Sequence, residues 1–114
     1  MSTAEALAQR QLDAYNAHDL EAFVACYADE VEVRTFPGAG PPDFTGHGAL
    51  RSRYGPLFEK GTIQAELLTR ITIGKTSIDH ERVTGLGEDR VVFAVAIYEV
   101  GDERIQKVWF IRGD

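Results

Sequence analysis

Three ionisable residues stand together in the second half of the chain: Asp79, His80 and Glu81. They fall in a stretch that alternates like a β-strand. Asp79 and Glu81 therefore share one face, and His80 lies on the other with Ile78 and Arg82. A carboxyl group shielded from water has a raised pKa and is suited to general acid–base work. Glu81, His80 and Asp79 are thus the candidate catalytic groups for proton transfer.

The register of the next strand decides which of these side chains faces the interior. If the connecting turn is centred on Gly87-Glu88, Glu81 pairs with Ala94 and Asp79 pairs with Ala96, and both carboxylates point inward. A shift of one residue reverses the faces and places the histidine inside instead.

The same charges also fit a structural role. An Arg/Glu/His network, for instance Arg70 or Arg82 with Glu81, would hold the sheet or a dimer together. The sequence leaves the structural and the catalytic interpretations open.

The other reactive residue types give weaker signals. His18 and His47 lie at a predicted helix end and helix start, where solvent exposure or capping is expected. Cys26 sits on the apolar side of a predicted helix and is interpreted as a buried small hydrophobe. No group of residues has metal-ligand spacing, and no glycine motif fits a phosphate or dinucleotide, so neither a metal site nor a cofactor is predicted.

Three helices are expected in the first half of the chain. Ser2 and Glu5 have the spacing of a capping box and start the first helix, which ends near residue 17. Asp19 is suited to cap a second, shorter helix. A third helix is expected over Gly46–Phe58, where Pro56 kinks or ends it.

The remaining elements alternate with the period of β-strands. A first strand is predicted over Val31–Phe36, followed by a loop rich in proline and glycine. Four more strands with short connections follow: Ile63–Ile73, Thr76–Gly85, Arg90–Val100 and Arg104–Arg112. Short turns imply antiparallel pairing. The order of elements predicts an α+β fold, with the helices packed on one face of a curved antiparallel sheet.

Composition limits the class of protein. The chain has 114 residues, 44% hydrophobic and 26% charged, with a net charge of −6. One domain over residues 1–114 is expected, and the acidic balance excludes a general nucleic-acid binder. A single cysteine excludes a disulfide-rich fold. Because no signal peptide and no apolar window of about 18 residues is present, no membrane partner and a cytoplasmic location are expected.

Two strand segments are apolar on both faces. Val91–Tyr98 and Val108–Ile111 do not alternate as strands with one wet face should. Helices cover only one face of a sheet, so a second copy of the chain is the simplest cover for the other. The sequence predicts a homodimer packed through the outer sheet face.

Four segments resemble a known family. Leu12–Phe23 and Tyr27–Val31 resemble the opening of the nuclear transport factor 2-like superfamily, in its SnoaL-like and ketosteroid-isomerase-like branch. Phe44–Leu50 resembles the entry to that family's third helix, and Gly101–Phe110 resembles its last hairpin. The resemblance implies a cone-shaped, curved antiparallel (partly mixed) sheet wrapped around three N-terminal helices, with one apolar pocket, usually as a dimer.

The ketosteroid isomerase mechanism does not carry over residue by residue. The resemblance places Thr35 where that family has its carboxylate base, Gln11 at its oxyanion-hole tyrosine and Ala96 near its protonated aspartate. A threonine hydroxyl is no general base near neutral pH. Two supporting tyrosines match, at Tyr27 and Tyr54. We therefore expect a retained pocket with different chemistry, because fold alone does not define function.

The resemblance directs several polar-tipped or small residues at the pocket. The expected ligand-binding set is Gln11, Tyr15, Tyr27, Thr35, Tyr54 and Ala96. Such groups suit one or two oxygens on an otherwise apolar small molecule. Alternatively, the polar tips bond to one another inside a filled core.

Two main functions follow. The first is cofactor-free isomerisation, dehydration or hydrolysis of a small, mostly apolar, oxygen-bearing molecule. The second is a non-catalytic ligand-binding or dimerisation module. A third option is a site similar to that of epoxide hydrolases, with an Asp–Arg–Asp set. Arg70 with Asp79 would begin such a set, but no second acid is evident.

Overall fold

The computed structural model describes residues 2–113. Its three helices are α1 (Thr3–Asn16), α2 (Leu20–Ala25) and α3 (Gly46–Lys60). The side chains of Ser2 and Asp19 cap α1 and α2, each accepting a backbone N–H at 3.1 Å, as predicted. The third helix ends at Lys60, two residues later than predicted, and Pro56 does not end it. Pro56 is exposed, so the carbonyl that it leaves without an N–H partner faces water.

Six strands form one mixed sheet in the order β2-β1-β6-β5-β4-β3. The strands are β1 (Tyr27–Thr35), β2 (Phe44–Thr45), β3 (Gln64–Ile73), β4 (Thr76–Thr84), β5 (Val92–Val100) and β6 (Ile105–Gly113). The antiparallel meander from β3 to β6 matches the prediction within two residues at each end. The sequence did not predict that β1 starts at Tyr27, that it pairs parallel with β6, or that the short β2 forms.

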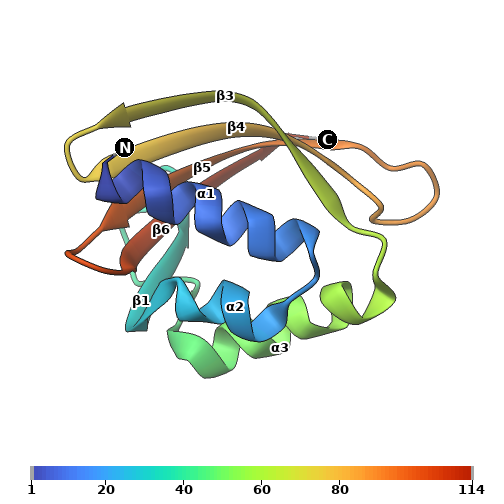
Figure 1. The fold of residues 1–114 in the computed structure, drawn as a ribbon, viewed down its shortest axis with the longest axis horizontal. Coiled ribbons are helices and arrows are strands. Elements are labelled where there is room, and N and C mark those ends of the chain that lie inside the picture. Colours follow the sequence, from blue (N-terminus) through green and yellow to red (C-terminus); the bar gives the residue numbers. More distant parts are fainter. Residues whose placement is uncertain (1, 114) are drawn as a thin grey trace.

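The helices cover one face of this curved sheet. In Figure 1 the sheet arches over α1, while α2 and α3 lie beyond α1 on the same side. This confirms the α+β class, with an open sheet rather than a closed barrel. The helices and the inner sheet face therefore enclose the interior between them.

Aromatic side chains fill the end of the core next to α2 and α3. The ring of Phe23, which is 2% exposed, lies 4.8 Å from that of Tyr54, 5.0 Å from Tyr27 and 5.3 Å from Phe58. The rings are tilted or edge-on, the arrangement that aromatic quadrupoles favour. This cluster joins α2 and α3 to β1 and forms one wall of the interior.

Gly85 ends β4 at a close backbone approach. Its φ of +81° favours glycine, and an added Cβ would lie 1.8 Å from the carbonyl oxygen of Thr62. The Thr62 hydroxyl in turn donates a hydrogen bond to the Gly85 carbonyl at 2.7 Å. This contact ties the end of β4 to the chain that leaves α3.

Gly85→Ala should therefore destabilise the protein by about 3 kcal/mol or more, since both the dihedral angle and the contact oppose a side chain. Gly74→Ala is the matched control, because Gly74 also has a positive φ, +58°, but nothing lies within 4 Å of its added Cβ. That variant should lose only about 1 kcal/mol. Urea unfolding measures both. Equal losses would contradict the close approach at Thr62.

Candidate ligand cavity and acid–base group

A cavity of about 320 Å³ lies between the helices and the inner face of the sheet. Its apolar wall is formed by Leu12, Phe23, Leu57, Ile63, Ala65, Val83, Leu86, Val92, Ala94 and Phe110. Its polar lining is formed by Gln11, Tyr15, Tyr27, Arg53, Tyr54, Glu81, Arg90, Tyr98 and Arg112. A mainly apolar wall with a few polar groups is typical of a small-molecule site.

The register of β4 against β5 places Glu81 at this cavity. Glu81 pairs with Ala94 and Asp79 with Ala96, as predicted for a turn centred on Gly87-Glu88. His80 is exposed on the opposite face, where its ring lies 6.4 Å from that of Phe93. This register corrects the inclusion of His80 among the candidate cavity groups, because successive side chains of a strand point to opposite faces.

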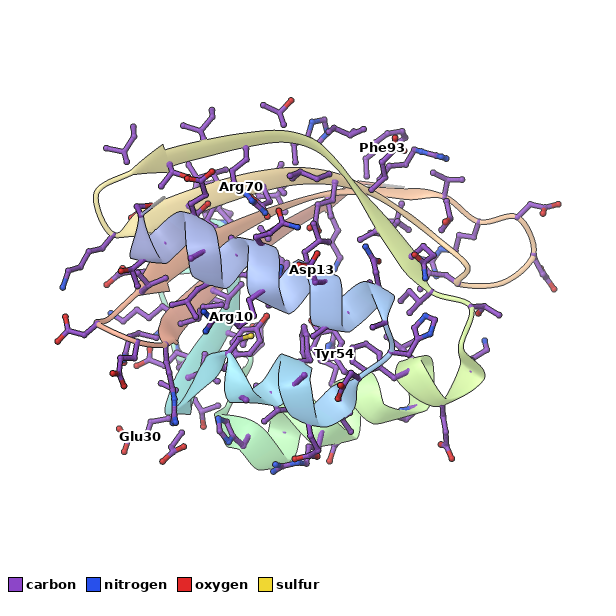
Figure 2. The ribbon with its side chains drawn as sticks, in the orientation of Figure 1. Arg10, Asp13, Glu30, Tyr54, Arg70 and Phe93 are labelled. Atoms are coloured by element: carbon purple, nitrogen blue, oxygen red, sulfur yellow. The ribbon has the colours of Figure 1, made fainter. Side chains whose placement is uncertain are left out.

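Asp79 is fully buried but does not line the cavity. Its two carboxylate oxygens accept hydrogen bonds from Nε and Nη2 of Arg70 at 2.7 and 2.9 Å. Arg70 also donates to Gln9 of α1 at 2.9 Å, and Figure 2 shows it between the sheet and this helix. A charge pair does join the strands here, but with other partners than expected: Arg70 pairs with Asp79 and Arg82 with Glu66, and neither pairs with Glu81. Asp79 is corrected from a candidate acid or base to a structural anion. Asp79 therefore does not begin an Asp–Arg–Asp site of the epoxide-hydrolase kind in this cavity, because neither Asp79 nor Arg70 lines it.

Glu81 differs from Asp79 in its hydrogen-bonding environment. Its side chain is buried, with 8% of the residue exposed, yet it forms no hydrogen bond or ion pair with any residue from 2 to 113. Burial raises the pKa of Glu81 to about 7, and the nearby Asp79 charge adds to the increase, while Arg70 opposes it. A carboxyl group with a pKa near neutrality exchanges protons readily at physiological pH.

Three tyrosine hydroxyls share the cavity with this carboxyl group: those of Tyr15, Tyr54 and Tyr98. None of them has a hydrogen-bond partner within the described part of the chain. No fully buried side-chain oxygen there lacks a partner, so these hydroxyls must open onto the cavity. Burial raises the pKa of all three, which keeps them neutral and able to donate.

Gln11 and Tyr27 also line the cavity, but they bond to each other. The Tyr27 hydroxyl donates to Gln11 Oε1 at 3.3 Å, and Gln11 Nε2 donates to the Ala8 carbonyl at 3.0 Å. The alternative of mutually bonded tips thus applies to this pair and not to Tyr15 or Tyr54.

Two residues of the expected ligand-binding set lie elsewhere. Thr35 is exposed at the end of β1, and its hydroxyl donates to Asp43 Oδ2 at 2.8 Å. Ala96 is fully buried beside Asp79, beyond the cavity wall. Both were placed by alignment to the family, and their absence from the lining corrects those two assignments. Tyr98 takes the inward position two residues after Ala96, which strand alternation would have indicated.

The remaining candidates have structural contacts. Nε2 of His18 lies 2.7 Å from the Ile63 carbonyl, and Nε2 of His47 lies 2.7 Å from the Tyr27 carbonyl. Both histidines are half-buried and join distant segments, where exposure or capping was expected. Cys26 is buried, as predicted. Within residues 2–113 no group of three His, Cys, Asp or Glu side chains is placed to hold a metal ion, and no helix there has the length and apolarity to cross a membrane.

The fold is α+β, with three helices and an open, curved, mixed sheet that enclose an apolar cavity. The sequence model of the SnoaL-like domain matches residues 8–108, so this chain belongs to the SnoaL-like domain family. No functionally curated protein matches the chain.

Solved structures of similar fold cover nearly the whole chain. An uncharacterized cystatin-fold protein from Novosphingobium aromaticivorans is 24% identical, with a TM-score of 0.84, over 98% of this chain and 99% of its own. A candidate ketosteroid isomerase from Kribbella flavida is 21% identical, with a TM-score of 0.78, over 98% and 78%. A candidate polyketide cyclase from Sinorhizobium meliloti is 16% identical, with a TM-score of 0.77, over 97% and 100%. These likenesses support the fold.

The raised pKa of Glu81 predicts a pH dependence of stability that Glu81→Gln should remove. Between pH 4.5 and about 7 the unfolded chain ionises Glu81 while the folded chain keeps it protonated. The folded state then binds more protons, so the free energy of unfolding decreases as the pH rises. The part due to Glu81 is on the order of 3 kcal/mol.

Urea unfolding of both proteins across this pH range measures the difference. Relative to the Gln variant, the free energy of unfolding of the wild type should decrease between pH 4.5 and about 7 and change no further above about pH 7. Parallel curves for the two proteins would mean that Glu81 titrates like an exposed carboxyl group.

Proposed function

We propose that this protein is a cofactor-free acid–base catalyst in which Glu81 moves a proton on a small, mostly apolar, oxygen-bearing molecule bound in the cavity. The observation that carries the proposal is the Glu81 carboxyl group, which opens onto an apolar cavity without a hydrogen-bond or ion-pair partner among residues 2–113. A structural carboxylate would be paired, as Asp79 is.

The cavity groups supply the base and the hydrogen-bond donors that an enolisation needs. The Glu81 carboxylate accepts the proton from a carbon next to a carbonyl group, and the electron pair of that C–H bond moves onto the carbonyl oxygen. The neutral hydroxyls of Tyr54, Tyr15 or Tyr98 donate hydrogen bonds to the resulting oxyanion. If the substrate also has a double bond between its β and γ carbons, the product is a dienolate, and return of the proton from Glu81 to the γ carbon completes an isomerisation. If the β carbon has a hydroxyl group, the enolate electron pair expels it, and the proton on Glu81 leaves with it as water, which completes a dehydration. For hydrolysis the same carboxylate would deprotonate a water molecule.

The names of two similar structures suit this class of reaction. The proteins described as a candidate ketosteroid isomerase and a candidate polyketide cyclase both carry names that refer to ketone-bearing molecules. The ketosteroid isomerase mechanism itself is not proposed here. Gln11 and Thr35 stand where that mechanism needs a tyrosine and a carboxylate, and the base proposed here comes from β4 instead.

Deuterium uptake by a bicyclic ketone tests the proposal. In D2O, catalytic amounts of the protein should accelerate exchange of the acidic CH2 protons of 2-tetralone, followed by proton NMR. The rate should rise with pH around a midpoint near 7, where Glu81 becomes a carboxylate. Glu81→Gln should reduce the protein-dependent rate by about 100-fold.

His80→Gln is the matched control for this experiment. His80 is the next residue on the same strand, but it points away from the cavity, so its replacement should leave the exchange rate unchanged. Equal rates in the wild type and the Glu81→Gln variant would exclude Glu81 as the base.

A second candidate function, a module that binds a ligand or dimerises without catalysis, is favoured by the outer sheet face. Ile71, Ile78, Ile97 and Trp109 stand directly opposite one another across four strands. Nearby apolar side chains are strongly exposed, including Ile71 at 52% and Phe93 at 48%. A continuous apolar row of this kind is typical of an association surface. We infer that a second copy of the chain covers it.

Ile97→Lys should convert the dimer to a monomer, because it places a charge in the middle of the apolar row. Light scattering coupled to size-exclusion chromatography at micromolar concentration measures the mass. Ser52→Lys, on the exposed side of α3, adds the same charge elsewhere and should leave the dimer intact. A monomeric wild type would exclude this interface.

A further inference from the structure

Arginine side chains form the exposed part of the cavity lining, here called its mouth. Among the residues that line the cavity, all of which the structure describes, only Arg53, Arg90 and Arg112 are classed as exposed, and every other one is buried or half-buried. The three come from α3, from the turn before β5 and from β6. A molecule in the cavity would therefore have guanidinium groups from three elements near the solvent-exposed part of the lining.

This placement differs from that of most arginines in the chain. Five others form ion pairs with carboxylates: Arg34, Arg51, Arg70, Arg82 and Arg104. Arg53 and Arg112 form none within residues 2–113, although the net charge of the chain is −6. Arg10 also forms none there, but it lies away from the cavity.

Aromatic rings hold these two guanidinium groups in place. Arg112 lies over the ring of Phe110, 4.5 Å from its centroid, and Arg53 lies 5.6 Å from the centroid of Phe44. Both distances are within the range of cation–π attraction, which favours a guanidinium group beside a ring and does not use its N–H groups as hydrogen-bond donors to an acceptor atom. The arrangement is suited to binding a planar anion.

Arg53 and Arg112 both affect the hydroxyl group of Tyr54. The positive charges of Arg112 and Arg53 both lower the pKa of Tyr54, against the larger effect of its burial. The Tyr54 hydroxyl therefore lies within electrostatic reach of both guanidinium groups. The same cavity is also lined by Glu81 and by aromatic and aliphatic side chains.

We infer that the ligand of this cavity is an organic carboxylic acid, whose apolar body fills the interior and whose carboxylate is bound at the mouth by Arg53 and Arg112. The inference rests on the proposed function insofar as it names the substrate class of the same cavity. Guanidinium forks match a carboxylate in shape as well as charge. A phosphate fits less well, because the lining has neither a glycine nor a first-turn residue of a helix to donate backbone N–H groups.

Isothermal titration calorimetry with two nearly isosteric probes tests the inference. 2-Naphthoate carries the carboxylate, and 2-naphthamide replaces it with a neutral amide of similar shape. The wild type should bind the acid at least about tenfold more tightly at low salt, and the preference should shrink as salt is added. 2-Naphthyl phosphate forms the third arm and should bind less tightly than the acid.

Arginine variants locate the preference. Arg53→Gln and Arg112→Gln should each reduce the ratio of the two affinities by at least about threefold, and the double variant should bring it close to one. Arg51→Gln is the matched control, since Arg51 lies on the same helix, is paired with Glu21 and does not line the cavity. It changes the net charge equally and should preserve the ratio. Circular dichroism confirms that each variant is folded.

The outcomes separate this inference from the proposed catalysis. A wild type that binds both probes equally, or neither, overturns the carboxylate assignment, as does a preference that survives the double variant or tighter binding of the phosphate. Because 2-tetralone is neutral, its Glu81-dependent exchange reports on catalysis alone. Exchange without a preference for the acid rejects only the substrate class. A preference that depends on the arginines, without exchange, rejects only the catalysis.

Discussion

The buried ion pair between Arg70 and Asp79 is the interaction on which the rest of the structure depends. The two residues face each other across β3 and β4, and Asp79 is completely shielded from water. A slip of either strand by one residue would separate the pair and leave a buried charge alone, at a cost of about 3–5 kcal/mol. The pair therefore fixes the register that turns Glu81 toward the cavity. Through Gln9 it also anchors α1 above the sheet.

The two carboxyl groups on β4 show how partners determine roles. Asp79 and Glu81 are two residues apart, face the same way and are both buried. Asp79 has a bidentate arginine partner, so its charge is compensated. Glu81 has no such partner and lies next to that fixed negative charge, so its own ionisation is opposed by burial and by its neighbour. The structural pair thus contributes to the reactivity of the group beside it.

Local patterns in the sequence predicted the helices and the meander, because capping, alternation and turn length act over a few residues. They left the face of Glu81 open, because a shift of one residue in the register of β4 against β5 would reverse it. The parallel contact of β1 with β6 joins residues far apart in the chain, and no local pattern reports it. For the same reason the sequence did not indicate that Arg53 and Arg112, on different elements, line the same cavity. Thr35 and Ala96 were placed by family alignment alone, and the cavity does not include them.

Small side chains beneath the cavity have a consequence for how such a protein changes over time. Ala65 and Ala94 form part of its floor and leave room that larger residues would occupy. Their replacement alters the free volume without touching the strand pairing, which depends on the backbone. The free volume of the cavity and the topology of the fold can then change independently of each other. A few point mutations at such positions can change the size and shape of the cavity while the topology stays constant, as expected where folds agree and sequences have diverged.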